Sequence, residues 1–344
     1  MPKVELLKRQ AEAVGLTANF NMAPQTTRFH NGPNSCGVEM LPSALTGQDS
    51  TGINDGSKTT TLVTYLADAW NWGAEMFCEC EVRHVEEASR HPDGGYIVYF
   101  AWHGKNRGYF KDNLHQDLLW VHAKKAVFFG AGAIGTTEIL LRSKEMGLSL
   151  SDRLGNGMSG NGDMLSFGYN TNFEANAIGR KRPDAYNPVG PTINAVIDCR
   201  NGHKNPLDGF VIEEGAIPRA LAPLFQTMLE LMPGSIKPQG ESCGAMIRSK
   251  LARLGSKILG PYLQRGAVDN TQVYLVMSHD SSQAALTLKN DKPVLEFLGV
   301  GRSDHVKKMH RLLAEMTTAV GGTLVRNPFE ALMGQQQVTV HPIG

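Results

Sequence analysis

The sequence predicts an α/β fold, α+β overall, with one part built around a glycine-rich loop and another around a mostly antiparallel sheet. Three observations support this prediction. An apolar run at 124–129 leads into Gly130-Ala131-Gly132-Ala133-Ile134-Gly135, and a helical pattern follows at 136–143. Beyond residue 170, alternating polar and apolar residues indicate half-buried strands. Two segments with apolar residues at helical spacing separate these strands.

The first part of the chain divides into a loop-rich stretch, a helix and a hairpin. Residues 1–57 are rich in Gly, Asn, Ser, Thr and Pro and lack apolar periodicity, so we expect mostly loop there. Helical spacing of apolar residues predicts a helix over 59–72. Residues 75–86 and 95–102 alternate and flank the turn-forming His91-Pro92-Asp93-Gly94-Gly95, which predicts a β-hairpin.

The remaining elements follow from the same periodicities. The run at 124–129 has the continuous apolar character of a strand buried on both faces, and Thr136 or Thr137 is suited to cap the next helix. The second half is expected to contain an antiparallel sheet and two helices. We predict strands at 192–197, 209–212, 272–277 and 284–288, and helices at 220–231 and 304–320.

Composition and charge exclude several classes of function. The 344 residues include 34 Lys and Arg against 33 Asp and Glu, which gives no reason to expect nucleic-acid binding. The N-terminus is charged and no apolar run reaches the roughly 18 to 20 residues of a membrane span, so neither a secretory signal nor an integral membrane segment is predicted. Five scattered cysteines favour reduced thiols in a cytoplasmic protein. Cys78 and Cys80 have no second pair nearby, so no metal site is predicted.

The residues of the glycine loop leave two interpretations open. Gly130, Gly132 and Gly135 satisfy G-x-G-x-x-G between a strand and a helix, where glycines let the backbone approach a pyrophosphate. The dinucleotide fingerprint also requires an acidic residue at the end of a second parallel strand. Asp152 has the right distance, but the segment before it is too short for that strand. An NAD(P)-dependent dehydrogenase and a packing turn without a nucleotide are therefore the alternatives.

Four separated segments share a more specific pattern. They are residues 58–67 with the strand through Val82; Phe129 to Ser143; Ser159-Gly160-Asn161-Gly162-Asp163; and Val340-His341-Pro342-Ile343-Gly344. In residues and order they resemble the glucose-methanol-choline (GMC) family of FAD-dependent oxidoreductases, and within it the cholesterol oxidase-like branch. The second segment is similar to the family's second signature, and His-Pro-x-Gly is similar to its active-site histidine motif.

The resemblance implies FAD as cofactor and a division of the chain into three parts. It implies a loop-rich remnant at 1–57, a partial Rossmann-like FAD-binding domain at 58–170 and a substrate-binding domain at 171–344. The family's first pyrophosphate-binding strand and its closing segment have no counterpart here, so the chain is expected to be an internal fragment. The cofactor-binding residues that the resemblance implies are Val82 beside the adenine, Gly130, Ala131 and Gly132 in the loop, and Asn161 in a tight turn.

The resemblance also implies oxidation of a sterol or another bulky alcohol, with hydride transfer to flavin N5 and oxygen as acceptor. His341 suits the role of base because imidazole titrates near neutral pH. Glu213 corresponds to the branch's active-site glutamate, and strand alternation predicts that Glu213 and Glu214 lie on opposite faces. A solvent-exposed pair of carboxylates is the alternative for these residues. A truncated, inactive remnant is the non-enzymatic alternative for the chain.

Overall fold

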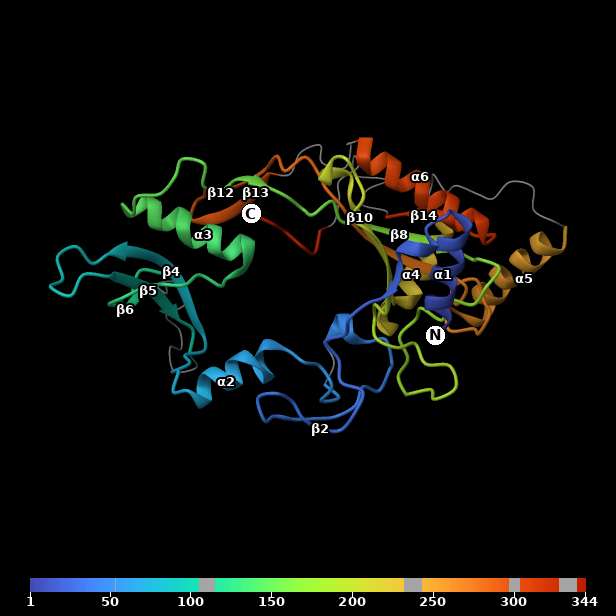
Figure 1. Cartoon of the computed structure of the whole chain (residues 1–344), viewed down its shortest axis with the longest axis horizontal. Helices are drawn as coiled ribbons and strands as arrows, with labels where there is room; N and C mark the ends of the chain where they lie inside the picture. The colour runs from blue at the N-terminus through green and yellow to red at the C-terminus, as the bar shows by residue number, and fades with distance from the viewer. Residues whose placement is uncertain (53, 105–114, 232–242, 297–303, 328–338) are drawn as a thin grey trace. The chain divides into compact units, whose positions relative to one another are not determined.

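The computed structural model describes residues 1–52, 54–104, 115–231, 243–296, 304–327 and 339–344, which form two compact units. The first unit comprises 1–72, 161–280 and 301–340, and the second comprises 73–160, 281–300 and 341–344. Each unit combines distant parts of the chain, unlike the contiguous segments 1–57, 58–170 and 171–344. The mixed α/β fold is confirmed, because helices accompany several mostly antiparallel sheets (Figure 1).

A six-stranded antiparallel sheet organises the first unit. Its strands, in spatial order, are β1 (Phe20–Met22), β9 (Ala195–Cys199), β10 (Phe210–Glu214), β11 (Gln272–Met277), β8 (Met164–Tyr169) and β14 (Thr323–Arg326). Three of these strands match the alternating segments of the sequence, with ends shifted by a few residues at β9 and β10. A short hairpin of β2 (Gly32–Pro33) and β3 (Glu39–Met40) lies outside this sheet.

Two helices cover one face of the sheet. α6 (Asp304–Ala319) buries the stripe that the sequence predicted, including Val306, Met309 and Leu313. Residues 1–57 were expected to be mostly loop, and the exception is their start, where α1 (Pro2–Ala13) is a regular helix. Charged residues interrupt its short apolar pattern, but Val4, Leu7 and Ala11 are buried against the sheet and α6. Tertiary burial therefore stabilises a helix whose local signal is weak.

The opposite face of the sheet is covered over only part of its width. α4 (Ala222–Leu231) packs Phe225 against Phe167 of β8, with ring centroids 4.8 Å apart. α5 (Cys243–Leu259) adds Ala252 to the same cluster. The β1–β9–β10 side of this face carries the cavity described below.

The hydroxyl of Tyr274 on β11 links both covering helices to the sheet. It accepts a hydrogen bond from Gln10 of α1 and shares one with Thr317 of α6 at 2.9 Å. We expect Tyr274→Phe to lower the free energy of unfolding by about 1–3 kcal/mol, because both partners stay buried and lose this bond. Urea unfolding measures the effect. An unchanged midpoint would contradict this role for the hydroxyl.

The second unit contains two small sheets and α3. β4 (Cys80–Glu87), β5 (Tyr96–Trp102) and β6 (Leu119–Ala123) form an antiparallel sheet, which confirms the predicted hairpin. β12 (Ala284–Lys289) pairs with β13 (Lys292–Glu296) and β7 (Asn156–Met158). α3 (Gly132–Glu145) packs on both β4 and β12 (Figure 1).

Two local predictions are wrong, and a third is confirmed over only part of its range. Residues 124–129 form no strand, and Phe128 is 93% exposed. A buried parallel strand requires neighbouring strands, and no described residue supplies them here. α3 begins at Gly132, so Thr137 lies inside the helix, where it donates to the Ala133 carbonyl at 2.7 Å instead of capping. The helix expected over 59–72 is a 3₁₀ turn, Thr61–Val63, followed by the short α2 (Tyr65–Asn71).

Candidate functional site

A cavity of about 760 Å³ opens on the uncovered part of the sheet in the first unit. In the register, Val211 lies opposite Asp198 on one side and Met277 on the other, and Glu213 lies opposite Val196. Side chains opposite one another in antiparallel strands point to the same face. All five residues line the cavity. Its volume falls within the roughly 300–1,000 Å³ of small-molecule sites.

The cavity wall combines apolar side chains with charged groups. Asp49 Oδ2 accepts a hydrogen bond from the Thr192 amide at 2.5 Å, and Lys58 Nζ donates to Thr26 Oγ1 at 2.6 Å. Asp198 pairs with Arg200 at 2.7 Å, and the hydrogen bond from Arg200 lowers the pKa of Asp198. Such a wall suits a ligand that combines apolar surface with several polar groups.

The adjacent carboxylates of Glu213 and Glu214 lie on opposite faces of β10, as strand alternation predicted. Glu213 is half-buried and lines the cavity. Glu214 is fully buried, where Oε2 lies 2.8 Å from Lys3 Nζ and Oε1 accepts from the amides of Asn194 and Ala195. Glu214 therefore has a structural role, and Glu213 is the carboxylate on the cavity side of β10.

Asn161 lines the same cavity as Glu213, although 52 residues separate them in the chain. Its φ of +58° is left-handed, a conformation that asparagine adopts more readily than most residues. Its carbonyl accepts from the Ser278 amide at 2.9 Å. The neighbouring Gly162 is tightly enclosed, since a Cβ there would lie 2.5 Å from Ser278 Oγ. This turn is therefore fixed in shape at the cavity wall.

The segment that carries His341 is hydrogen-bonded to the segment that carries Asn161. In the first unit, Asp163 Oδ2 accepts from the Val340 amide at 2.9 Å and from Thr339 Oγ1 at 3.1 Å. In the second unit, Ser159 and Ile343 exchange two backbone hydrogen bonds of 2.8 Å. Two motifs that the sequence analysis took separately therefore pair with each other. The exposed His341 belongs to the second unit and Glu213 to the first.

Four of the five predicted FAD contacts, Val82, Gly130, Ala131 and Gly132, belong to the second unit, and Asn161 belongs to the first. Val82 is a half-buried residue of β4, the strand on which α3 packs. Gly130, Ala131 and Gly132 form an exposed loop at the start of α3, and no side chain caps this helix. Gly132 has a φ of +74°, and a Cβ at Gly130 or Gly132 would meet nothing within 4 Å. The open loop and the uncapped amides fit one end of a dinucleotide.

The same unit disagrees with a dinucleotide fingerprint of the NAD(P) type. That fingerprint needs a second parallel strand after the helix, ending in an acidic residue. The strand that follows α3 in the described chain is β7, which pairs antiparallel with β12. Asp152 is exposed, and its carboxylate pairs with Lys144 Nζ at 2.7 Å. This arrangement weighs against the dehydrogenase alternative.

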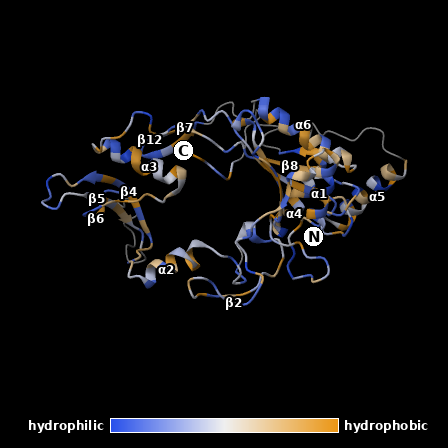
Figure 2. Ribbon diagram, in the orientation of Figure 1, coloured by the Kyte–Doolittle hydropathy of each residue, from blue (hydrophilic) through white to orange (hydrophobic). Residues whose placement is uncertain are grey.

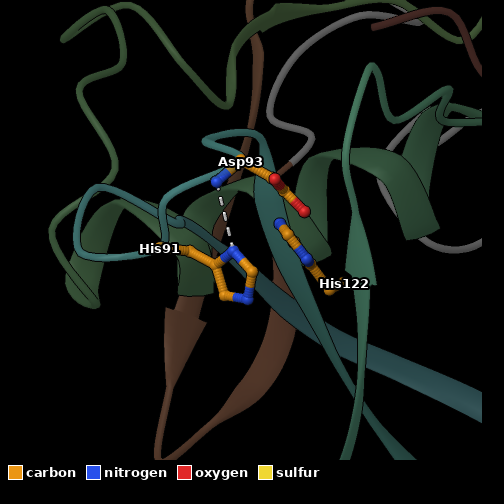
Figure 3. Close-up of side chains that lie close together, drawn as sticks. All are labelled: His91, Asp93 and His122. Carbon is orange, nitrogen blue, oxygen red and sulfur yellow. Dashed lines mark hydrogen bonds between the residues drawn. The ribbon is translucent and has the colours of Figure 1, made fainter.

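One group of side chains in the second unit could hold a metal ion. His91 and Asp93 in the β4–β5 turn and His122 on β6 place one ligand atom each within 4.8 Å of one another (Figure 3). His122 Nε2 donates to the Gly94 carbonyl at 2.7 Å, which leaves Nδ1 with the lone pair. However, Lys124 Nζ lies 3.0 Å from Asp93 Oδ2 and competes for that carboxylate. A cation would have to displace the lysine.

A second cavity in the first unit, of about 540 Å³, is lined by basic side chains, including Arg180, Lys181 and Arg219, and by the buried Asp269. The Arg219 guanidinium lies 4.1 Å from the centroid of the Tyr262 ring. Burial raises the pKa of Asp269 to about 6, although its Oδ2 accepts from the Arg265 amide at 2.7 Å. The protonation state of this carboxyl therefore depends on pH near neutrality.

We expect Asp269 to make the stability of the chain depend on pH. Between the ordinary pKa of 3.8 and about 6, the folded state holds a proton that the unfolded state releases, so stability falls as pH rises. Relative to Asp269→Asn, the wild type should lose roughly 2 kcal/mol of unfolding free energy between pH 4 and pH 7. Urea unfolding at both pH values tests this. Equal pH dependence in the two proteins would contradict it.

The sequence analysis missed several residues at the main cavity. Asp49, Lys58, Asp198, Arg200, Met277 and His279 line it together with Glu213. Alternation along β9 and β10 would have placed Asp198 on the face of Glu213 once the strands were paired. No local signal in the loops predicted the positions of Asp49 and Lys58.

In comparisons with known proteins, no protein-family model matches the chain and no curated protein matches its sequence. None of the helices within the described ranges is long and apolar enough to cross a membrane.

Proposed function

We propose that the chain belongs to an FAD-dependent oxidoreductase that oxidises the CH–OH group of a bulky alcohol. One observation carries this proposal. The turn that holds Asn161 lines a cavity with Glu213 and is flanked by residues that hydrogen-bond the segment of His341. All three residues belong to segments that resemble GMC oxidoreductases.

Each residue has a role that follows from its chemistry. Glu213 lines the cavity and orients the bound alcohol. His341 of the second unit is the base that the resemblance implies, since an imidazole ring nitrogen can accept a hydroxyl proton. Within the first unit, Asp163 fixes Thr339 and Val340, the residues that precede His341 in the chain. The alcohol loses that proton and a hydride from carbon, which leaves a carbonyl product.

The residues that would hold FAD are Val82, Gly130, Ala131, Gly132 and Asn161. The chemistry that FAD supplies when bound is acceptance of the hydride at flavin N5. The open glycine loop leaves room for the cofactor, while the apolar part of the cavity wall excludes water from the alcohol.

The substrate class follows from the size and character of the cavity. A volume of about 760 Å³ is large enough for a sterol or another bulky alcohol, the substrate class that the resemblance implies. Oxygen as electron acceptor and a cytoplasmic location complete the proposal.

An FAD titration separates this proposal from the NAD(P) alternative. We expect the purified chain to quench flavin fluorescence on binding FAD and to show no saturable binding of NADH or NADPH. Gly132→Val should weaken FAD binding, since the position has a φ of +74° and adjoins the uncapped helix amides. Gly202→Val, at an exposed glycine with a φ of +87° in the other unit, is the matched control. Saturable NADH binding without FAD binding would contradict the proposal.

A further inference from the structure

Helix α5 in the first unit packs with its small residues inward and its large apolar residues outward. Ser256 is fully buried, and the carbonyl and Oγ of Ser249 accept hydrogen bonds from Asn170 Nδ2 at 3.1 and 2.8 Å. The Ala252 carbonyl accepts from the Ala267 amide. The inward face is therefore satisfied by small side chains and backbone contacts.

The outward face is a narrow apolar stripe. Its residues recur at intervals of four, three and four, which places them on one side of a helix. They are Ile247, Leu251, Leu254 and Ile258, and they are 53–70% exposed. Because these side chains make little contact with the body of the unit, the fold of the unit does not account for them.

Basic residues border the apolar stripe. α5 contains Arg248, Lys250, Arg253 and Lys257 and no acidic residue, and Figure 2 shows hydrophobic and hydrophilic residues interleaved along it. Lys250 and Lys257 are exposed. A helix with a basic face, an apolar stripe and no acidic residue has the character of helices that lie in a membrane interface.

A shallow groove of about 390 Å³ continues the stripe. Ile247, Leu251 and Leu263 form its apolar lining, and Arg248 and Arg265 add positive charge. The Arg248 guanidinium donates to Asn172 Oδ1 at 2.8 Å, which holds it beside the groove. An acyl chain with an anionic headgroup matches this combination.

We propose that the exposed face of α5 binds the surface of an anionic lipid bilayer. The stripe enters the boundary between headgroups and acyl chains, and the basic residues contact lipid phosphates or carboxylates. A second copy of the chain is the other occupant to consider. Arg253 packs over the Tyr169 ring, so the exposed basic residues are Arg248, Lys250 and Lys257. Two copies of this face would bring six positive side chains together without a carboxylate from either helix, which opposes self-association.

Flotation with vesicles of phosphatidylcholine alone, or of phosphatidylcholine with phosphatidylserine, tests the proposal on the full chain. We expect binding to the anionic vesicles, little binding to the neutral ones and weaker binding as salt is raised. Lys250→Gln with Lys257→Gln should weaken binding roughly 25-fold, at about fivefold per charge. Leu254→Ala with Ile258→Ala should weaken it at least about 100-fold, since six carbons are removed from the stripe.

The matched control is Lys204→Gln with Leu207→Ala, an exposed basic and apolar pair outside α5 in the same unit. It should bind like the wild type. Three outcomes would overturn the proposal: no binding to anionic vesicles at low salt, equal binding to neutral vesicles, or equal loss in the control. Sedimentation of the wild type as a dimer that Leu254→Ala with Ile258→Ala dissociates, without vesicle binding, would instead identify a second copy as the occupant.

Discussion

Lys3→Met should lower the free energy of unfolding by about 3–5 kcal/mol, because it leaves the buried Glu214 carboxylate without its counter-charge. Both side chains are 0% exposed, and Lys3 Nζ also donates to the carbonyls of Pro191 and Thr192, each at 3.0 Å. Burial lowers the pKa of Lys3, while the Glu214 carboxylate opposes that shift. The pair joins α1 to β10, so its loss should loosen the first unit.

Urea unfolding followed by circular dichroism measures this effect. Lys144→Met is the control, because it breaks an ion pair that involves the exposed Asp152. In that pair Lys144 Nζ lies 2.7 Å from Asp152 Oδ1, and its loss should leave the midpoint unchanged. A wild-type midpoint for Lys3→Met would show that the buried pair does not stabilise the fold.

His341→Ala should slow reduction of bound flavin by an alcohol about 10²–10⁴-fold in a single turnover, the usual contribution of a positioned general base. FAD affinity should stay close to that of the wild type, since His341 acts on the substrate. Stopped-flow absorbance under anaerobic conditions measures the rate. An unchanged rate would exclude His341 as the base.

Two further variants separate the role of His341 from that of its neighbours. His30→Ala replaces an exposed histidine of the first unit that does not line the cavity, and it should not change the rate. Asp163→Ala removes the acceptor for Thr339 and Val340 and should slow flavin reduction less than His341→Ala does. Equal effects of His341→Ala and His30→Ala would contradict a specific role for His341.

Periodicity predicted the elements whose burial is one-sided. β11 matches the alternating segment 272–277, and α6 buries the predicted stripe, because one face of each packs on a core. The hairpin of β4 and β5 was predictable because a Pro-Asp-Gly-Gly turn separates two alternating runs. In these cases local sequence and tertiary packing agree.

Elements that depend on distant partners were not predictable. The polar and charged residues of α1 gave no apolar pattern long enough to recognise, and the contact between Lys3 and Glu214 spans 211 residues. Conversely, 124–129 reads as a buried strand but pairs with no described strand. α1 is stabilised by partners far away in the chain, whereas 124–129 has no strand partner among the described residues.

The sequence predicted two of the residues that line the main cavity, Asn161 and Glu213, and missed the others. Alternation placed Glu213 and Glu214 on opposite faces, and the structure shows which of them is buried. Asn161 and Glu213 line one cavity, a result that spacing along the chain does not imply. Lys58 and Asp49 reach the same cavity from loops, whose paths follow from tertiary contacts.

The most direct test of the proposed function is anaerobic mixing of the FAD-loaded chain with a sterol or another bulky secondary alcohol, while the visible absorbance of the flavin is recorded. We expect the oxidised flavin spectrum to bleach, and Glu213→Gln to raise the alcohol concentration needed for the half-maximal rate. A chain that binds no FAD, or bound flavin that no bulky alcohol reduces, would contradict the proposed function.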